Sequence, residues 1–193
     1  MSYEPLRLAV IVSSNREGRF GHVVGDWFAG EARRRDDVVV DVIDLADHEL
    51  PTSLSREPSP EVAESLSKIS PRLAQADTFV VVTPEYNHSF PASLKNVLDW
   101  HHTEWQAKPV GFVSYGGLSG GLRAVEQLRP VFAELHAVTV RDVVSFHMAW
   151  ERFGEDGAPK DDASVAAAKV LLDQLGWWGN ALREARAKTP YGS

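Results

Sequence analysis

Short apolar runs alternate along this chain with segments in which apolar residues recur at three- and four-residue spacing. The continuous runs predict buried strands, and the spaced segments predict the helices between them. Strands are expected at 6–13, 38–43, 77–83, 110–113 and 137–144, and helices begin near residues 23, 62, 94, 125 and 162. Five strands with interleaved helices predict a doubly wound, three-layer α/β sandwich.

Proline and loop signals mark the limits of these elements. Pro71 is expected to break or kink the second helix, and Pro130 to kink the fourth. Residues 147–159 are expected to form a long loop before the last helix. No repeat or low-complexity tract interrupts the alternation, and a chain of this length is expected to form a single domain over residues 1–193.

Three polar, glycine-bearing loops follow the first, third and fourth strands, at 13–21, 84–87 and 114–121. If these strands are parallel and joined by helical crossovers, the three loops lie along the same edge of the sheet. Open α/β folds bind ligands at that edge. The sequence therefore predicts one composite pocket built by all three loops.

The first loop reads Ser-Ser-Asn-Arg-Glu-Gly-Arg-Phe-Gly and lies between a strand and a helix N-terminus. Free backbone amides, the positive end of the helix dipole, hydroxyls and two guanidinium groups converge there, which favours a phosphate site. The loop matches neither the Walker pattern nor the GxGxxG fingerprint. An ordinary helix cap with solvated arginines remains the alternative.

The second and third loops suit a flat ligand. Pro84-Glu85-Tyr86-Asn87 is followed by Pro91, expected as the first residue of the next helix, and the prolines stiffen a segment that offers backbone groups, an amide and the Tyr86 ring. The third loop, 114–121, contains four glycines that allow a close approach of the main chain to a ligand. A loose, helix-starting turn is the alternative for this third loop.

Composition narrows the classes of partner. The net charge of −7 argues against binding to nucleic acid or to an anionic membrane, and leaves small molecules as the expected ligands. The chain has no cysteine, no basic-then-apolar signal pattern at its N-terminus and no apolar run long enough to cross a bilayer. We expect a cytoplasmic protein, and we expect no metal site.

Three motifs in order carry a family resemblance: Pro84-Glu85-Tyr86-Asn87, the following Leu-Lys-Asn-Val-Leu-Asp-Trp at 94–100, and Gly-Phe-Val-Ser at 111–114 before the glycine loop. The chain resembles the NAD(P)H-dependent FMN reductases of flavodoxin-like fold, which include bacterial quinone and chromate reductases. This resemblance implies a five-stranded parallel sheet in the order 2-1-3-4-5, with helices on both faces. The first loop departs from the family pattern at Ser13, where many members have glycine, and at Arg19, where many have serine.

The resemblance also implies which residues bind the cofactor. The first-loop residues implied to hold the FMN phosphate are Ser14, Asn15, Arg16, Arg19, Phe20 and Gly21. Those implied to contact the isoalloxazine ring are Pro84, Glu85, Tyr86 and Asn87, and those implied to line its far side are Ser114, Gly116 and Gly117.

The same resemblance implies an activity. Hydride passes from NADPH or NADH directly to N5 of FMN and then, in a ping-pong cycle, to a flavin, a quinone or a similar small acceptor. This chemistry needs orientation and an open stacking face rather than an ionisable side chain, so no catalytic residue is assigned. Members of the family commonly form homodimers or homotetramers through the helix that follows the second loop.

Two other functions remain as alternatives. A flavodoxin-type electron carrier would bind FMN without turning over a nicotinamide. A serine hydrolase would use Ser119, since Gly117-Leu118-Ser119-Gly120-Gly121 matches the G-x-S-x-G nucleophile elbow and is followed by Asp142 and His147. The spacing disfavours the hydrolase, because Ser119 lies beyond the tip of the strand.

Overall fold

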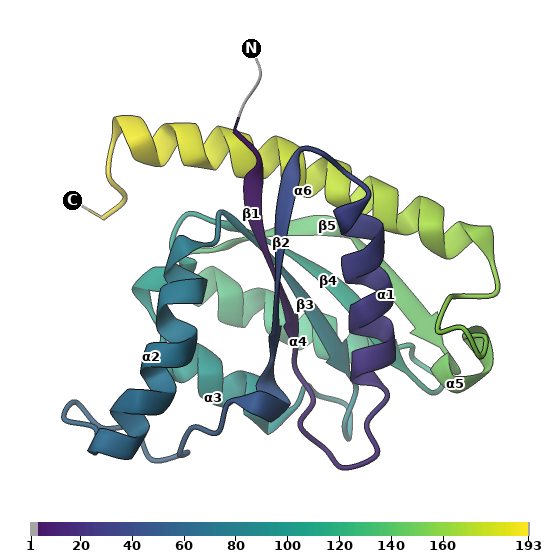
Figure 1. Cartoon of the computed structure of the whole chain (residues 1–193), viewed down its shortest axis with the longest axis horizontal. Helices are drawn as coiled ribbons and strands as arrows, with labels where there is room; N and C mark the ends of the chain where they lie inside the picture. The colour runs from purple at the N-terminus through teal and green to yellow at the C-terminus, as the bar shows by residue number, and fades with distance from the viewer. Residues whose placement is uncertain (1–3, 193) are drawn as a thin grey trace.

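The computed structural model describes residues 4–192 (Figure 1). Met1–Tyr3, which belong to the segment expected to lack a signal pattern, and Ser193 lie outside the described residues. One parallel sheet runs through the centre of the molecule in the order β2-β1-β3-β4-β5, which confirms the predicted topology. Its strands are β1 (Leu6–Val12), β2 (Val38–Asp44), β3 (Thr78–Pro84), β4 (Pro109–Gly116) and β5 (Val138–His147).

Helices cover both faces of the sheet, as Figure 1 shows. On one face pack α1 (Gly21–Arg33) and α6 (Asp162–Lys188). On the other pack α2 (Pro60–Gln75), α3 (Ala92–Trp100) and α4 (Leu122–Glu134). Three short helices complete the described chain: η1 (Leu45–Asp47), η2 (Thr103–Trp105) and α5 (Ala149–Arg152). Across residues 4–192, no helix has the length and hydropathy needed to span a bilayer.

Two separate cores explain why the central strands are apolar at every position. Val10 packs with α1 and α6, whereas Ile11 packs with α2, α3 and α4, and Val80 and Val81 divide between the same two cores. Successive side chains of a strand point to opposite faces, so a strand covered on both sides must be apolar throughout. The continuous apolar runs in the sequence therefore correctly predicted a sheet covered on both faces.

The prolines within the helices do not end them. α2 continues through Pro71 to Gln75, and α4 continues through Pro130 to Glu134, so the expected break at Pro71 is wrong. Proline removes one backbone hydrogen bond, and in α2 the buried side chains of Ile69 and Leu73 hold the helix against the core on either side of it. The packing of these side chains outweighs the loss of one backbone hydrogen bond in the helix.

Two further boundaries differ from the expectation. Pro91 lies at the N-cap of α3 rather than inside it, with extended backbone at φ −60° and ψ 142°. The segment predicted as a loop at 147–159 contains the short helix α5, which begins after Met148 in the left-handed conformation at φ 48°. This helix returns the chain to the carboxyl edge of the sheet.

Strand register brings the predicted loops together at that edge. Val12 pairs with Val82, Pro84 with Tyr115, and Gly116 with His147 at the strand ends. The backbone bonds continue past the strands: the Glu85 amide donates to the Tyr115 carbonyl at 3.3 Å and the Met148 amide to the Gly117 carbonyl at 3.0 Å. All three loops and α5 thus form one rim.

Candidate functional site

A cleft of about 490 Å³ opens at this rim between the three loops and α5. Its walls include eight of the thirteen residues predicted to bind the cofactor: Arg16, Arg19, Phe20, Pro84, Glu85, Tyr86, Gly116 and Gly117. Residues from three loops that are far apart in the sequence therefore share one cavity, as the composite-pocket prediction requires.

The first loop presents an open helix N-terminus to the cleft. A turn closes between the Arg19 amide and the Arg16 carbonyl at 3.2 Å, with Gly18 at φ 65°. The next residue, Phe20, is the N-cap of α1 and has no polar side-chain atom to bond the first amides of the helix. Unsatisfied amides and the helix dipole together attract an anion. The first loop thus leaves the start of α1 open to an anion, and its role as a phosphate site stays a prediction.

The two arginines of this loop have different surroundings. Arg19 donates two hydrogen bonds to the Asp44 carboxylate, at 2.8 and 2.6 Å, and both side chains are largely buried. Within residues 4–192, no carboxylate pairs with Arg16, whose side chain is exposed at the cleft. Arg16 is therefore free to meet an anion, whereas Arg19 already ties the first loop to the end of β2.

A buried hydroxyl lies against the start of α1. Tyr115 is 6% exposed, and its hydroxyl finds no hydrogen-bond partner among the described residues. Burial, together with the nearby Tyr86, raises the pKa of the Tyr115 phenol above its usual range, so it stays a neutral donor. A Cβ added to Gly21 would lie 2.6 Å from this hydroxyl, so only glycine fits between helix and phenol. An unpartnered buried hydroxyl is costly and points to a ligand.

The second loop closes in a tight turn. Tyr86 and Ser89 exchange backbone hydrogen bonds of 2.8 and 3.0 Å, and the two residues between them, Asn87 and His88, are left-handed at φ 50° and 74°. Asparagine tolerates this conformation. The Tyr86 amide is therefore occupied within the turn, and the Tyr86 hydroxyl shares a 2.6 Å hydrogen bond with Ser14.

Glu85 joins the second loop to the third. Its side chain is 8% exposed and accepts hydrogen bonds from the Ser119 hydroxyl at 2.5 Å, the Arg123 amide at 3.2 Å and the Arg123 guanidinium at 3.1 Å. Burial alone would raise the pKa of Glu85, but the bonds from Ser119 and Arg123 outweigh it and the pKa is lowered. The carboxylate therefore fixes the glycine loop in place and does not offer itself as an acid or base.

The four glycines of the third loop divide into two pairs. Gly120 and Gly121 are left-handed, and a Cβ on Gly121 would lie 2.8 Å from the Ser114 Cβ. Gly116 and Gly117 line the cleft and have more room around them. The first pair is required by the fold, and the second leaves main chain accessible to a ligand.

The geometry removes the hydrolase alternative. The Ser119 hydroxyl donates to Glu85, the His147 Nδ1 bonds the Leu118 carbonyl at 2.9 Å, and the Asp142 carboxylate accepts from Arg141 and Gln174. Each member of the supposed triad is thus engaged with another group. A nucleophilic serine requires a hydrogen-bonded histidine base.

Five predicted residues lie outside the cleft walls. Ser14, Gly21 and Ser114 are buried behind them, and Ser114 donates to the Gly120 carbonyl at 2.8 Å. Asn87 is exposed in its turn, and Asn15 faces a neighbouring hollow beside the start of α3. The sequence in turn missed five residues that do line the cleft: Glu17, Gly18, Tyr115, Ala149 and Trp150. Tyr115 adjoins predicted residues on both sides, but nothing in the pattern marked Trp150.

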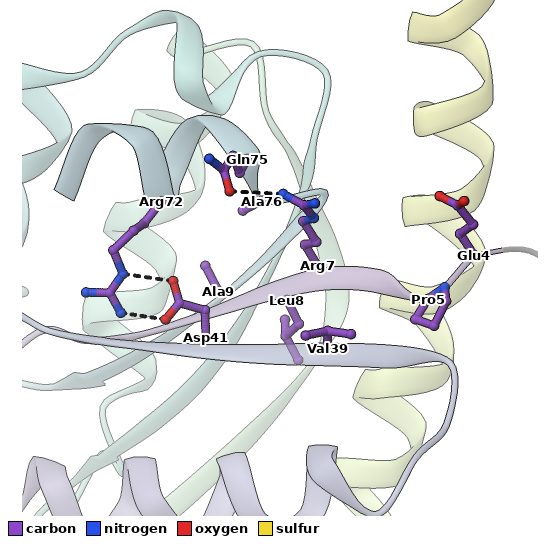
Figure 2. Close-up of a pocket in the computed structure, with 10 residues that line it drawn as sticks. All are labelled: Glu4, Pro5, Arg7, Leu8, Ala9, Val39, Asp41, Arg72, Gln75 and Ala76. Atoms are coloured by element: carbon purple, nitrogen blue, oxygen red, sulfur yellow. Dashed lines mark hydrogen bonds and ion pairs between the residues drawn. The ribbon is translucent and has the colours of Figure 1, made fainter. Parts of the chain in front are cut away.

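A larger cavity of about 670 Å³ lies elsewhere, beside the first residues of β1 and β2 and the end of α2 (Figure 2). Four of its polar side chains are paired with each other: Arg72 with Asp41, and Arg7 with Gln75 at 2.9 Å. Larger volume alone does not make it the better candidate, because the unpartnered groups lie at the carboxyl edge.

The residues at the carboxyl edge fit a phosphorylated, flat, conjugated molecule. Arg16, the first amides of α1 and the Tyr115 hydroxyl are donors suited to phosphate, and Tyr86, Gly116 and Gly117 offer an aromatic wall and open backbone. A doubly wound sheet with such a cleft defines a flavodoxin-like, mononucleotide-binding protein. The sequence pattern of the NADPH-dependent FMN reductase family matches residues 6–151, and the chain belongs to that family. This match confirms the family that the sequence motifs indicated.

Similar proteins agree with this assignment. An NAD(P)H-dependent FMN reductase of Schizosaccharomyces pombe is 36% identical over 122 residues, which cover 60% of each chain. The match thus spans well under two thirds of that relative. A 2-hydroxy-1,4-benzoquinone reductase of Burkholderia sp is 33% identical over 139 residues, 69% of this chain and 73% of that one. The structure of a flavoenzyme NAD(P)H:(acceptor) oxidoreductase from Paracoccus denitrificans superposes with a TM-score of 0.71 at 22% identity, over 91% of this chain and 98% of that one, and shows the shared fold.

Proposed function

We propose that this protein is an NAD(P)H-dependent FMN reductase that passes electrons from a reduced nicotinamide to a quinone, a flavin or a similar small acceptor. The observation that carries the proposal is the unpartnered Tyr115 hydroxyl beside the uncapped α1 and the free Arg16, within a cleft built by all three loops. The similarity to a benzoquinone reductase supports a quinone as acceptor.

Different residues of the cleft are proposed to bind different parts of the cofactor. Arg16, the α1 amides and Tyr115 hold the phosphate, and Arg19 acts through Asp44 by fixing the loop. Pro84, Tyr86, Gly116 and Gly117 hold the ring. Once bound, FMN supplies hydride uptake from the nicotinamide and two-electron transfer to the acceptor.

The protein's own part in the reaction is orientation and not proton transfer. Two carboxylates line the cleft: Glu17 is exposed on the first loop, whereas Glu85 bonds Ser119 and Arg123 and is held ionised. A quinone acceptor takes up the hydride equivalent and one proton from water, so the balance needs no side-chain acid. Nicotinamide and acceptor are proposed to occupy the same open side of the cleft in turn, which gives ping-pong kinetics.

Anaerobic reduction tests the proposal. The protein is loaded with FMN, separated from free flavin and titrated with NADPH and with NADH. Loss of the visible flavin band, followed by its return on adding a benzoquinone, is the expected result. Binding of FMN without bleaching by either nicotinamide would identify an electron carrier, and failure to retain FMN would refute the proposed site.

We also propose a homodimer or homotetramer. Support comes from Trp177 and Trp178 on α6, whose side chains are 66% and 37% exposed. The two rings contact each other edge to face, with their centroids 5.0 Å apart. Exposed aromatic side chains are enriched at protein interfaces. Light scattering that gives a particle of 21.3 kDa at micromolar concentration would contradict this. The cytoplasmic location stays a prediction from the sequence.

A further inference from the structure

Trp150 occupies an unusual place at the mouth of the cleft. The helix α5 is anchored by Ala149, which is 1% exposed, while the next residue, Trp150, is 60% exposed and lines the cleft. An indole carries more apolar surface than most side chains and is usually buried for most of its area. An exposed Trp beside a cleft offers a flat surface on which a planar molecule can stack.

The contacts of α5 fix this indole beside the glycine loop. The Met148 amide donates to the Gly117 carbonyl at 3.0 Å, which ties the corner before α5 to that loop. A Cβ added to Gly117 would lie 3.6 Å from the Cη2 of Trp150, so the edge of the indole lies directly over this glycine. Trp150 is thus held at the side of the cleft formed by Gly116 and Gly117.

Two exposed apolar side chains lie near Trp150 along the backbone. Leu118 is 85% exposed and Met148 is 39% exposed. Met148 lies two residues before Trp150, and the His147 Nδ1 bonds the Leu118 carbonyl at 2.9 Å. Of these three apolar residues, Trp150 is the one that lines the cleft, whose wall also includes Arg16.

We propose that Trp150 is a specificity-determining residue, whose indole provides the stacking wall for a flat, conjugated electron acceptor such as a quinone. The proposal rests on the proposed function and names which residue selects the second substrate. Offset or edge-on aromatic contact favours planar acceptors, and the indole of Trp150 gives no comparable contact to a compact anion.

The test compares two acceptors of different shape. The FMN-loaded protein and its Trp150→Ala and Trp150→Phe variants are assayed with NADPH against a naphthoquinone and against ferricyanide, which is neither planar nor apolar. The control is Tyr191→Ala, which removes an aromatic side chain that is 49% exposed and bonds His136, away from the cleft. Retention of FMN is measured for each protein by its absorption spectrum before any turnover.

Trp150→Ala is expected to lower the ratio of kcat/KM for the naphthoquinone to that for ferricyanide by roughly tenfold, mainly through KM for the quinone. Trp150→Phe should recover most of the ratio, and Tyr191→Ala should match the wild type. An equal loss with both acceptors, or an unchanged ratio, would overturn the role of Trp150 while leaving the reductase intact. A wild-type protein that binds FMN but turns over neither acceptor would refute the proposed function, and this inference with it.

Discussion

Replacing Glu85 tests whether one buried carboxylate holds the second and third loops of the cleft together. The wild-type carboxylate accepts three hydrogen bonds, one from Ser119 and two from Arg123, and is 8% exposed. Glu85→Ala leaves the Ser119 hydroxyl and the Arg123 amide without this acceptor. Glu85→Gln keeps one oxygen for both of them and loses only the charge and the bond to the guanidinium.

The two substitutions should differ in size. The two bonds to this buried ionised acceptor, from Ser119 and from the Arg123 amide, contribute about 1.5 kcal/mol each, and the half-exposed guanidinium adds roughly 0.5 kcal/mol. We therefore expect Glu85→Ala to lower the free energy of unfolding by roughly 3.5 kcal/mol and Glu85→Gln by roughly 1 kcal/mol. Both should weaken FMN binding, because Pro84 and Gly116 lie on the two loops that Glu85 joins.

Urea denaturation followed by circular dichroism measures these differences, with Ser119→Ala as the partner in a double-mutant cycle. The pH dependence adds a second readout. The pKa of Glu85 is lowered in the folded protein, so its stabilisation is complete above the usual carboxyl pKa and is lost as pH falls through the lowered value. The deficit of Glu85→Gln should accordingly shrink at acid pH.

The reasoning fails if Glu85→Ala and Ser119→Ala each leave the free energy of unfolding within about 0.5 kcal/mol of wild type, the range of ordinary surface substitutions. It also fails if the two substitutions are additive, because residues that share a hydrogen bond should show a coupling of about 1 kcal/mol.

Three further predictions follow from single contacts. Arg16→Ala should weaken FMN binding by roughly tenfold, whereas Arg19→Ala breaks an internal ion pair and should mainly cost about 1 kcal/mol of stability; fluorescence titration and urea unfolding separate the two. Gly121→Ala should destabilise by about 2 kcal/mol, because its φ is 84° and its Cβ would meet backbone and side chain, while Gly30→Ala, which meets nothing within 4 Å in α1, should be neutral or stabilising by thermal melting. Burial lowers the pKa of Lys108 to about 8. Above that pH the unfolded chain binds more protons at this residue than the folded chain does, so its contribution to the free energy of unfolding should rise by roughly 3 kcal/mol toward pH 10.5. Lys108→Met should remove this rise, and an equal dependence of the free energy of unfolding on pH in the two proteins would contradict the prediction.

Periodicity was sufficient for the fold because the sheet is covered on both faces. Runs such as 79–82 must be apolar at every position when neighbours like Val80 and Val81 enter different cores, and this pattern is readable without coordinates. The break expected as one outcome at Pro71 does not occur, for the complementary reason. Its local cost is visible in the sequence, whereas the burial of Ile69 and Leu73 that offsets it depends on the packed core.

The site was predictable at the level of loops and not at the level of side-chain partners. Strand ends, prolines and glycines locate the loops at 13–21, 84–87 and 114–121, and parallel topology then brings them together. Which arginine is free depends on Asp44, twenty-five residues from Arg19 and brought beside it by the register of β2 with β1. No local pattern contains that contact.

The glycine loop shows why such partners decide function. In the sequence its four glycines are equivalent, but the structure gives Gly120 and Gly121 a left-handed backbone and leaves Gly116 and Gly117 at the cleft. The left-handed pair places Ser119 where it can donate to Glu85, and that bond aligns the second loop with the third. The open backbone that faces a ligand therefore depends on glycines that do not line the cleft, so substitutions there should impair binding through geometry and not through lost contact.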